Sequence, residues 1–310
     1  MIHIPETSTE LAGAMGLTMA QLRSLTRDTE SHYRRFEVPK GGGCGTRAIS
    51  APDALLERAQ RWVLRELLET VELHDCAHGF RHDRSVRTNA LPHLGARVVC
   101  NLDIAGFFPR VNYRRVHGVF TGLGCNPAIA TLLACLCTEK RAEKSIPQGA
   151  CTSPYIANIV CKRLDSRLHG LALACGIAYT RYADDMTFSG DNVGAMDLFI
   201  ADARVIINEE SFVVNESKTH VMVAPGPRIV TGLSVGNEAG NGLVIPRDSV
   251  RKLKAILYNC MEYGLSSQNR LWHEDFGGYL TGLVGHYCSI DPGLSDKLCP
   301  LLERALRYSS

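Results

Sequence analysis

The sequence lacks the features of a membrane protein, of a secreted protein and of a protein stabilised by a structural metal ion. No stretch approaches the roughly 20 apolar residues of a membrane-spanning helix, and the first ten residues lack the basic start and apolar run of a secretory signal. The chain has 12 cysteines, but no two of them have the CxxC spacing of a zinc or redox motif. We therefore expect a cytoplasmic protein with no membrane partner, whose cysteines are small buried side chains.

Neither sign of charge dominates, since the formal net charge is only +2. The charges are nevertheless unevenly placed: basic residues are in excess at 101–180, acidic residues at 181–246, and basic residues again at 247–254. An acidic block between basic ones is the arrangement expected of a metal site beside surfaces that bind phosphate. Solvated charged faces give the same pattern, so the distribution alone does not decide the function.

Strands and helices are interleaved through most of the 310 residues, which is enough chain for about two domains. Alternation of apolar and polar residues predicts hairpins at 33–52, around a glycine-rich turn, and at 177–190. Apolar residues spaced three to four apart predict helices, and shorter apolar runs predict further strands. The helices are expected at 8–27, 53–73, 113–139, 153–175, 195–210 and 247–308, and the single strands at 96–104, 212–214, 219–224 and 229–235. Without a regular βαβ period, this order predicts an α+β body with a helical C-terminal region.

Three aspartates stand at the ends of predicted strands. Asp103 lies near the end of the apolar strand 96–104, and Asp184 and Asp185 lie in the tight turn of the hairpin 177–190. Carboxylates beside apolar strands are costly to bury unless a cation accompanies them. Oxygen ligands of this kind suit Mg²⁺, and two-metal phosphoryl transfer uses carboxylates from different elements. The pattern therefore predicts a magnesium-dependent site for phosphoryl transfer.

The same aspartates belong to sequence motifs. Residues 182–185 read YADD, residues 102–109 read LDIAGFFP, residues 146–154 read IPQGACTSP and residues 215–218 read NESK. In this order and spacing they resemble the YxDD, first-aspartate, PQGxxxSP and lysine-bearing motifs of reverse transcriptases. The resemblance covers roughly residues 8–260. It implies an RNA-directed DNA polymerase that uses deoxynucleoside triphosphates (dNTPs) and two Mg²⁺ ions.

Two further segments resemble one branch of that family, the bacterial retron reverse transcriptases. Residues 78–93 read HGFRHDRSVRTNALPH and resemble the NAxxH segment of that branch, and residues 230–233 read VTGL and resemble its VTG segment. The resemblance implies an enzyme that copies its own structured non-coding RNA into single-stranded DNA joined to RNA. It also implies a role in anti-phage defence with a separate effector or toxin protein as a partner.

The resemblance implies a right-hand polymerase fold, in which an antiparallel palm sheet is packed with helices. We expect an N-terminal helical segment at 1–35 and fingers at 36–100. The palm is expected at 101–240, with finger-derived helices at about 113–145, and a helical thumb at 241–310.

Three aspartates would carry the catalysis if the resemblance holds. Asp103 and Asp184 would bind the two Mg²⁺ ions, and the carbonyl oxygen of Ile104 would complete one coordination shell. Asp185 would be a weaker ligand or an electrostatic neighbour. One ion would lower the pKa of the attacking hydroxyl group, and the other would neutralise charge on the triphosphate. Because no protein nucleophile is required, the chain needs no serine or cysteine triad.

The resemblance also assigns residues to the incoming nucleotide. An aromatic ring beneath the sugar would exclude a ribose 2′-hydroxyl, and basic residues beside the glycine-rich turn would clamp the triphosphate. A glutamine–glycine pair would shape the pocket, and a lysine would donate to the leaving pyrophosphate. The nucleotide-binding residues are expected to be Lys40, Arg47, Phe108, Gln148, Gly149 and Lys218.

Contacts with RNA are expected from two regions of the chain. The first is the pair of retron-like segments, for which a hydrogen-bonded structural role of Asn89 and His93 is the alternative interpretation. The second is the basic start of the C-terminal helical region, where side chains at three-to-four spacing share one face and can meet phosphates. The expected RNA-binding residues are Asn89, His93, Thr231, Gly232, Leu233, Arg247, Arg251 and Lys254.

Other interpretations stay open at the level of the sequence. Another prokaryotic reverse transcriptase, of the diversity-generating or group II intron type, would carry the same motifs, although no maturase or endonuclease extension follows residue 310. A catalytically silent scaffold that binds RNA or a toxin would share the fold, but it need not keep costly acids. A DNA-binding regulator built on residues 8–27 would explain only a small part of the chain.

Overall fold

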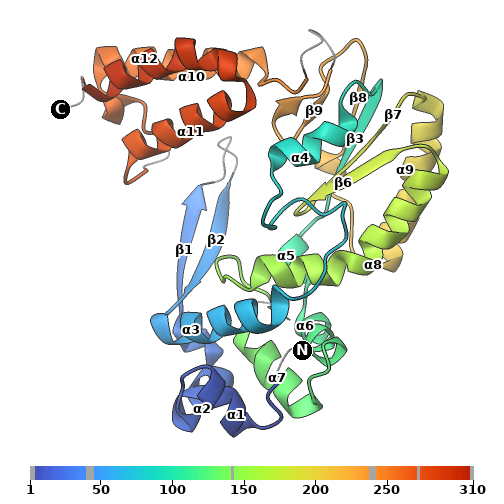
Figure 1. Ribbon diagram of the computed structural model, residues 1–310, viewed down its shortest axis with the longest axis vertical. Helices are drawn as coiled ribbons and strands as arrows, with labels where there is room; N and C mark the ends of the chain where they lie inside the picture. Colours follow the sequence, from blue (N-terminus) through green and yellow to red (C-terminus); the bar gives the residue numbers. More distant parts are fainter. Residues whose placement is uncertain (1–3, 40–44, 141–142, 237–241, 271–272, 308–310) are drawn as a thin grey trace.

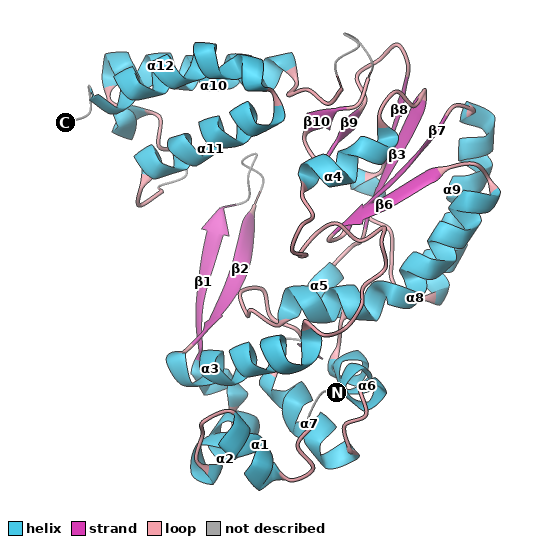
Figure 2. Cartoon of the chain, viewed as in Figure 1, coloured by secondary structure: helices cyan, strands magenta, loops and turns pink. Residues whose placement is uncertain are grey.

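The computed structural model describes residues 4–39, 45–140, 143–236, 242–270 and 273–307. Figure 1 shows three groups of elements: N-terminal helices that carry a protruding hairpin, a sheet flanked by helices, and a set of C-terminal helices. Figure 2 shows that the sheet group alternates strand and helix, whereas the C-terminal group is helical. The mixed α+β class with antiparallel strands agrees with the prediction.

The N-terminal group carries the first predicted hairpin. Strands β1 (Tyr33–Pro39) and β2 (Thr46–Pro52) pair antiparallel over their whole length. The Asp53 carboxylate accepts hydrogen bonds from two amides of the following helix and caps it. This helix continues through a π-helical segment and ends at Leu68, earlier than the predicted residue 73. The helices of the group are α1 (Ser8–Ala14), α2 (Met19–Arg27), α3 (Ala54–Val63), α6 (Tyr113–Gly122) and α7 (Pro127–Leu136).

A four-stranded antiparallel sheet lies at the centre of the second group, in the order β6–β7–β3–β8. Side chains alternate between the faces of a strand, so Leu102, Met186 and Phe188 share one face, and all three are fully buried. Helices α8 and α9 cover this face (Figure 1). The bounds are β3 (Val98–Asp103), β6 (Ala178–Tyr182), β7 (Asp185–Gly190), β8 (His220–Val223), α8 (Ser153–Ala174) and α9 (Val193–Glu209).

The opposite face of the sheet is polar but also buried. Thr180, Thr187 and Ser189 lie on it, and none of them is more than 2% exposed. Helix α4 (Val86–Ala90) and the 3₁₀ helix η3 (Leu91–His93) pack against this face at β6 and β7. The β6–β7 hairpin is therefore held between an apolar layer and a layer of hydrogen-bonding side chains.

Short elements connect these layers. They are α5 (Phe107–Arg110), β4 (Glu139–Lys140), β5 (Lys144–Ser145), β9 (Ile229–Val230) and β10 (Leu233–Ser234). The strand expected at 212–214 is reduced to a single bridge between Ile104 and Val214. The expected strand at 229–235 is divided into β9 and β10, which pair with each other.

Three helices form the C-terminal group and share a second apolar core with the β9–β10 hairpin. They are α10 (Arg247–Tyr263), α11 (Phe276–Ile290) and α12 (Ser295–Arg307). The region predicted to be helical, 247–308, is divided into these helices: α10 ends just before Gly264, whose φ of +79° favours glycine and does not continue a helix. Within the described residues, none of the helices has the length and apolar character needed to cross a membrane.

Phe188 provides a test of the apolar layer beneath the β6–β7 hairpin. Its ring stacks 4.8 Å from that of Tyr179 and lies 4.9 Å from that of Phe199, measured between ring centroids. We predict that Phe188→Ala lowers the free energy of unfolding by about 3–5 kcal/mol, because it leaves a cavity between aromatic rings. The matched control is Leu198→Ala on α9, a residue that is 74% exposed, which should change stability by about 0.5 kcal/mol or less. Equal losses in denaturant unfolding would contradict this assignment of the core.

Candidate active site

The sheet brings three distant aspartates to one edge. Asp103 ends β3 and stands directly opposite Asp185, the first residue of β7. Asp184 lies in the turn between β6 and β7, and its carbonyl oxygen accepts a hydrogen bond of 3.0 Å from the Ile104 amide. The turn and the end of β3 are thus joined through backbone as well as through the sheet register. The three carboxylates converge although about 80 residues of chain separate the first from the other two.

The surroundings of these acids disfavour their charged forms. Burial raises the pKa of Asp184, and the nearby charge of Asp103 raises it further. Burial also raises the pKa of Asp185 to about 6, with added repulsion from Asp184 and Asp103. One cation offsets part of this cost: the Lys218 ammonium lies 2.9 Å from Asp103 Oδ2, and the contact raises the lysine pKa.

These donors fit a divalent metal ion. Carboxylate oxygens that repel one another at a partly buried edge are stabilised by a hard cation. In the part of the chain that the structure describes, no three metal-binding side chains stand close enough to form a complete cage. A cation bound by Asp103 and Asp184 would therefore take its remaining ligands from water and substrate oxygens, as Mg²⁺ does.

A cavity of about 650 Å³ opens beside the acids. Asp103 and Asp184 line it, together with four of the residues expected to contact the nucleotide, namely Arg47, Phe108, Gln148 and Lys218. The phenyl ring of Phe108 is half-buried, whereas Phe107 is only 4% exposed and packs in the core. Lys40 lies outside the described residues.

The glycine of the PQG motif sets the position of its loop through a close backbone contact with β2. Gly149 does not line the cavity among the described residues, but packs against β2. A Cβ atom there would lie 2.7 Å from the carbonyl oxygen of Ser50, and φ is +124°. The Ser50 amide donates a 2.7 Å hydrogen bond to the Gln148 carbonyl. The close approach of the two backbones fixes the position of the Gln148 loop relative to the hairpin that carries Arg47.

The retron-like segments meet each other, but three of their side chains are not available to RNA. Asn89 and His93 are 0% exposed, and Leu233 is 1% exposed within the second core. The expectation of direct RNA contact by these three side chains is therefore wrong, because protein atoms already cover them. The Thr231 hydroxyl donates to the Val86 carbonyl at 3.2 Å, which ties the second segment to the first. Gly232 remains exposed.

His93 has the structural role that was the alternative interpretation. Its Nδ1 lies 2.7 Å from Ser189 Oγ, and its Nε2 lies 2.8 Å from Thr180 Oγ1. Burial lowers the pKa of His93 to about 3, with a smaller contribution from the charge of His78, so the imidazole is neutral at physiological pH. The His93 ring thus links β7, through Ser189, to β6, through Thr180.

The basic residues at the start of α10 are accessible. Arg247 and Arg251 are exposed and Lys254 is half-buried. The guanidinium of Arg251 lies 3.4 Å from the carboxylate of Asp248 one turn away, a contact that water screens. RNA binding by these residues stays a prediction.

The comparison with protein families identifies the fold and the chemistry. Residues 38–258 match the family model described as reverse transcriptase (RNA-dependent DNA polymerase). The chain is 36% identical to the retron Mx65 reverse transcriptase of Myxococcus xanthus over 94% of this chain and 70% of that protein. It is 37% identical to the retron Mx162 reverse transcriptase of the same organism, over 82% of this chain and 59% of that protein.

The chain belongs to the retron reverse transcriptases. It is also 34% identical to the retron Ec86 reverse transcriptase of Escherichia coli, over 81% of this chain and 77% of that protein. The predicted family is thereby confirmed, and the enzyme is an RNA-dependent DNA polymerase by family. It spans only part of the length of each of these three relatives.

Solved structures give weaker similarities. A telomerase from Candida albicans bound to a fragment of telomeric RNA matches with a TM-score of 0.48 and 12% identity, over 89% of this chain and 59% of that chain. A foamy viral protease–reverse transcriptase bound to double-stranded DNA matches with a TM-score of 0.45 and 14% identity, over 89% of this chain and 43% of that chain.

The sequence analysis did not identify the roles of two residues near the site, Asn215 and Glu139. Asn215 donates from Nδ2 to Asp103 Oδ1 at 3.2 Å, and its place in the NESK motif was the available signal. Glu139 is 2% exposed, lines the cavity and accepts hydrogen bonds from the Ser50 hydroxyl at 2.8 and 2.9 Å. It also contacts Arg35 at 3.3 Å and so ties both strands of the hairpin to the body. No local pattern announces this contact, because its partners are about 90 residues or more away in the chain.

Phe108 generates a test of the cavity. If its ring lies beneath the sugar of the incoming nucleotide, Phe108→Ala opens space for a 2′-hydroxyl. We predict that the preference of this enzyme for deoxynucleotides over ribonucleotides falls at least about tenfold in single-nucleotide incorporation, while dNTP incorporation persists. The matched control is Phe36→Ala, since Phe36 is an exposed aromatic residue of β1 that does not line the cavity. An unchanged preference in Phe108→Ala would place the selecting group elsewhere.

Proposed function

We propose that this enzyme copies a structured non-coding RNA into single-stranded DNA that stays joined to RNA, using dNTPs and two Mg²⁺ ions. One observation carries the proposal: the acids at the end of β3 and in the β6–β7 turn meet beside a cavity lined by Arg47, Phe108, Gln148 and Lys218. A scaffold that only bound RNA would gain nothing from acids whose burial raises their pKa.

The proposed mechanism follows from where these side chains stand. Asp103 and Asp184 hold the metal ions, with the Ile104 carbonyl as a further ligand and Asp185 as their electrostatic neighbour. When bound, the ions lower the pKa of the attacking hydroxyl group and neutralise charge on the triphosphate. The chain supplies orientation for this step, because the reacting oxygen must lie in line with the phosphorus atom.

The remaining residues of the cavity bind the nucleotide. Arg47 and Lys40 contact the triphosphate from the hairpin, and Phe108 and Gln148 border the sugar and base. Gly149 lets the Gln148 loop approach β2 closely. The Lys218 ammonium, which lies 2.9 Å from Asp103 Oδ2, lines the same cavity and would donate to the leaving pyrophosphate.

The proposed domains follow the right-hand polymerase plan. Residues 1–35 form the N-terminal helical segment, 36–100 the fingers, 101–240 the palm and 241–310 the thumb. In Figure 1 the β1–β2 hairpin extends from the N-terminal helices toward α11. Arg47, on β2 of this hairpin, lines the cavity. Finger-derived helices at about 113–145 correspond to α6 and α7, of which α7 packs against α1, α2 and α3.

The proposed partners are nucleic acid and protein. Arg247, Arg251 and Lys254 of α10 contact the phosphate backbone of the RNA and of its RNA–DNA product. The turn at Thr231 and Gly232, which precedes α10 in the chain and in which Gly232 is exposed, is proposed as a further RNA contact. The relatives are retron enzymes, and on that basis we propose a role in anti-phage defence with a separate effector protein.

Asp184 tests the proposed chemistry. Asp184→Asn keeps the size of the side chain and removes its charge. The metal ion then loses a charged ligand, and the transition state of phosphoryl transfer loses the stabilisation that the ion supplies. We predict that primer extension on an RNA template with Mg²⁺ falls at least about 10³-fold, while RNA binding is retained. Asp197→Asn, in an exposed acid of the same acidic block on α9, is the control and should extend primers normally. Normal extension by Asp184→Asn would exclude the two-metal assignment.

The salt dependence of RNA binding tests the basic face of α10. Phosphate contacts release counterions whatever the base sequence. We predict that Arg247→Gln weakens binding to all templates alike and reduces the slope of log affinity against log salt by about one unit. Arg23→Gln on α2, an exposed arginine at the opposite end of the molecule in Figure 1, should leave the slope unchanged. If both variants keep the wild-type slope, α10 does not contact phosphate.

A further inference from the structure

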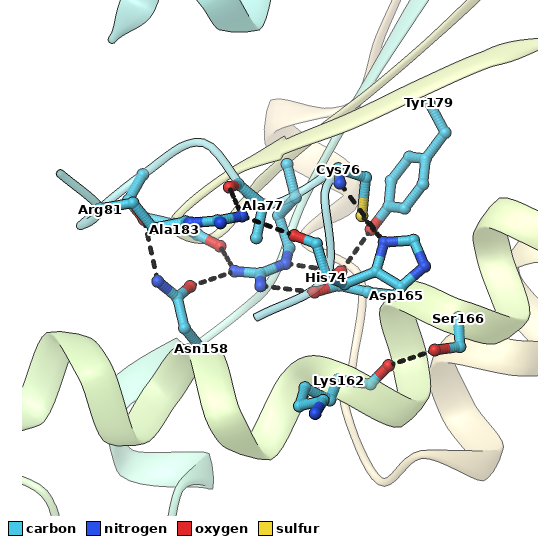
Figure 3. A network of polar contacts seen from close by, with 12 residues as sticks. His74, Cys76, Ala77, Arg81, Asn158, Lys162, Asp165, Ser166, Tyr179 and Ala183 are labelled. Atoms are coloured by element: carbon cyan, nitrogen blue, oxygen red, sulfur yellow. Dashed lines mark hydrogen bonds and ion pairs between the residues drawn. The ribbon is translucent and has the colours of Figure 1, made fainter. Parts of the chain in front are cut away.

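A buried ion pair lies directly behind the catalytic turn. Arg181, on β6, is 0% exposed, and the side chain of its partner Asp165, on α8, is 1% exposed. The guanidinium donates from Nε to Asp165 Oδ1 at 2.8 Å and from Nη2 to Oδ2 at 2.7 Å. The Tyr179 hydroxyl donates to the same carboxylate at 2.9 Å, so the acid accepts three hydrogen bonds. Figure 3 shows Asp165 and Tyr179 within this network.

The remaining end of the guanidinium reaches the catalytic motif itself. Arg181 Nη1 donates to the Ala183 carbonyl oxygen at 2.9 Å and to Asn158 Oδ1 at 3.1 Å. Ala183 directly precedes Asp184 and has a φ of +59°, the left-handed conformation that non-glycine residues rarely adopt. The Ala183 carbonyl and the Asp184 nitrogen belong to one planar peptide group. The orientation of this group therefore helps to set the direction of the Asp184 side chain.

A second segment, residues 76–79, packs against β6 and the turn. The Arg181 amide donates to the Cys76 carbonyl at 2.7 Å, and the His78 amide donates to the Arg181 carbonyl at 2.8 Å. Asn158 Nδ2 donates to the Gly79 carbonyl at 2.9 Å, which brings this segment to the same helix. A Cβ atom at Gly79 would lie only 2.5 Å from the Ala183 nitrogen. The left-handed residue is therefore fixed between the Arg181 guanidinium and the backbone of Gly79.

Stability alone does not explain the ion pair. A buried pair of charges is often no more stabilising than apolar residues of similar volume, because each charge loses its hydration. An apolar pair would, however, leave the Ala183 carbonyl without this donor. The rigid fork of arginine can hold a carboxylate with one edge while another N–H reaches the carbonyl, which an ammonium on a flexible stem does less well.

We propose that Arg181 is a positioning residue for DNA synthesis. Asp165 and Asn158 orient its guanidinium, and the guanidinium holds the Ala183 carbonyl so that Asp184 is presented to metal and substrate. The proposal rests on the proposed catalytic function of Asp184. It assigns the ion pair to the geometry of the turn and not to the stability of the fold.

A combined substitution separates the two roles. Arg181→Met with Asp165→Leu and Tyr179→Phe removes both charges and the hydroxyl that bonds to the carboxylate, so no unpaired charge remains in the core. We expect a melting temperature close to that of the wild type. We also expect kcat for primer extension to fall on the order of 100-fold, the size of effect that small misplacements of a reacting group produce. The KM for dNTP should change much less, because the nucleotide-binding side chains are untouched.

Metal dependence and a control complete the experiment. The Mg²⁺ concentration that gives half-maximal kcat should rise in the combined variant, because the Asp184 ligand is less well directed. Arg167→Met is the matched control: this arginine lies on α8, as Asp165 does, and pairs with Glu209 and Glu210, which lie outside the turn. It should leave kcat and the Mg²⁺ dependence unchanged.

The outcomes distinguish this proposal from the proposed function. A folded combined variant with wild-type kcat and Mg²⁺ dependence would make the pair purely structural and overturn the positioning role. If the combined variant does not fold, Arg181→Lys, which keeps the charge, replaces it: a folded lysine variant with reduced kcat supports the proposal, and one with wild-type kcat overturns it. A wild-type enzyme without DNA synthesis, or a fully active Asp184→Asn variant, would instead overturn the proposed function.

Discussion

Repulsion between carboxylates is the constraint on which this site depends. The antiparallel register places Asp103 directly opposite Asp185, and like charges at opposed positions of a sheet are destabilising. Lys218 and Asn215 both contact Asp103, and the charge of Lys218 also lowers the pKa of Asp184 and Asp185 in part. Burial and mutual repulsion nevertheless keep the pKa values of Asp184 and Asp185 raised, and a divalent cation bound here would relieve this repulsion.

A sheet edge with this much repulsion must be held from both faces. The apolar face rests on Phe188 and the two long helices, α8 and α9. The polar face is fixed by neutral His93, which bonds to β6 and β7 at once. The NAxxH segment therefore packs behind β6 and β7. The same layer contacts Thr231, so the two retron-like segments form one structural unit.

Local patterns predicted much of this structure. The hairpins at 33–52 and 177–190 and the acids of the YADD turn depend on residues close together in the chain, and each is where the sequence placed it. Helix ends were less predictable: the stretch 113–139 is divided at Gly124, whose φ is +95°. The burial of Asn89 was not visible, because segments far along the chain cover it.

The same reason explains why the ion pair was missed. Arg181 and Asp165 are separated by a helix end and a strand, and only the packing of β6 on α8 brings them together. Nothing in the local sequence distinguishes this arginine from an exposed one. By contrast, Asp103 and Asp184 were found because their motifs carry them, before any distance between them was known.

The central claim is that the carboxylates at this edge hold two metal ions around the reacting groups. The most direct measurement is a structure of the enzyme with Mg²⁺, an RNA template, a primer and an unreactive dNTP analogue. We expect two ions about 3.5–4 Å apart, with oxygens of Asp103 and Asp184 at about 2.0–2.1 Å from them. The Lys218 ammonium should have moved from Asp103 toward the phosphates. A complex with the nucleotide in the cavity, but with the ions bound away from Asp103 and Asp184, would contradict the account.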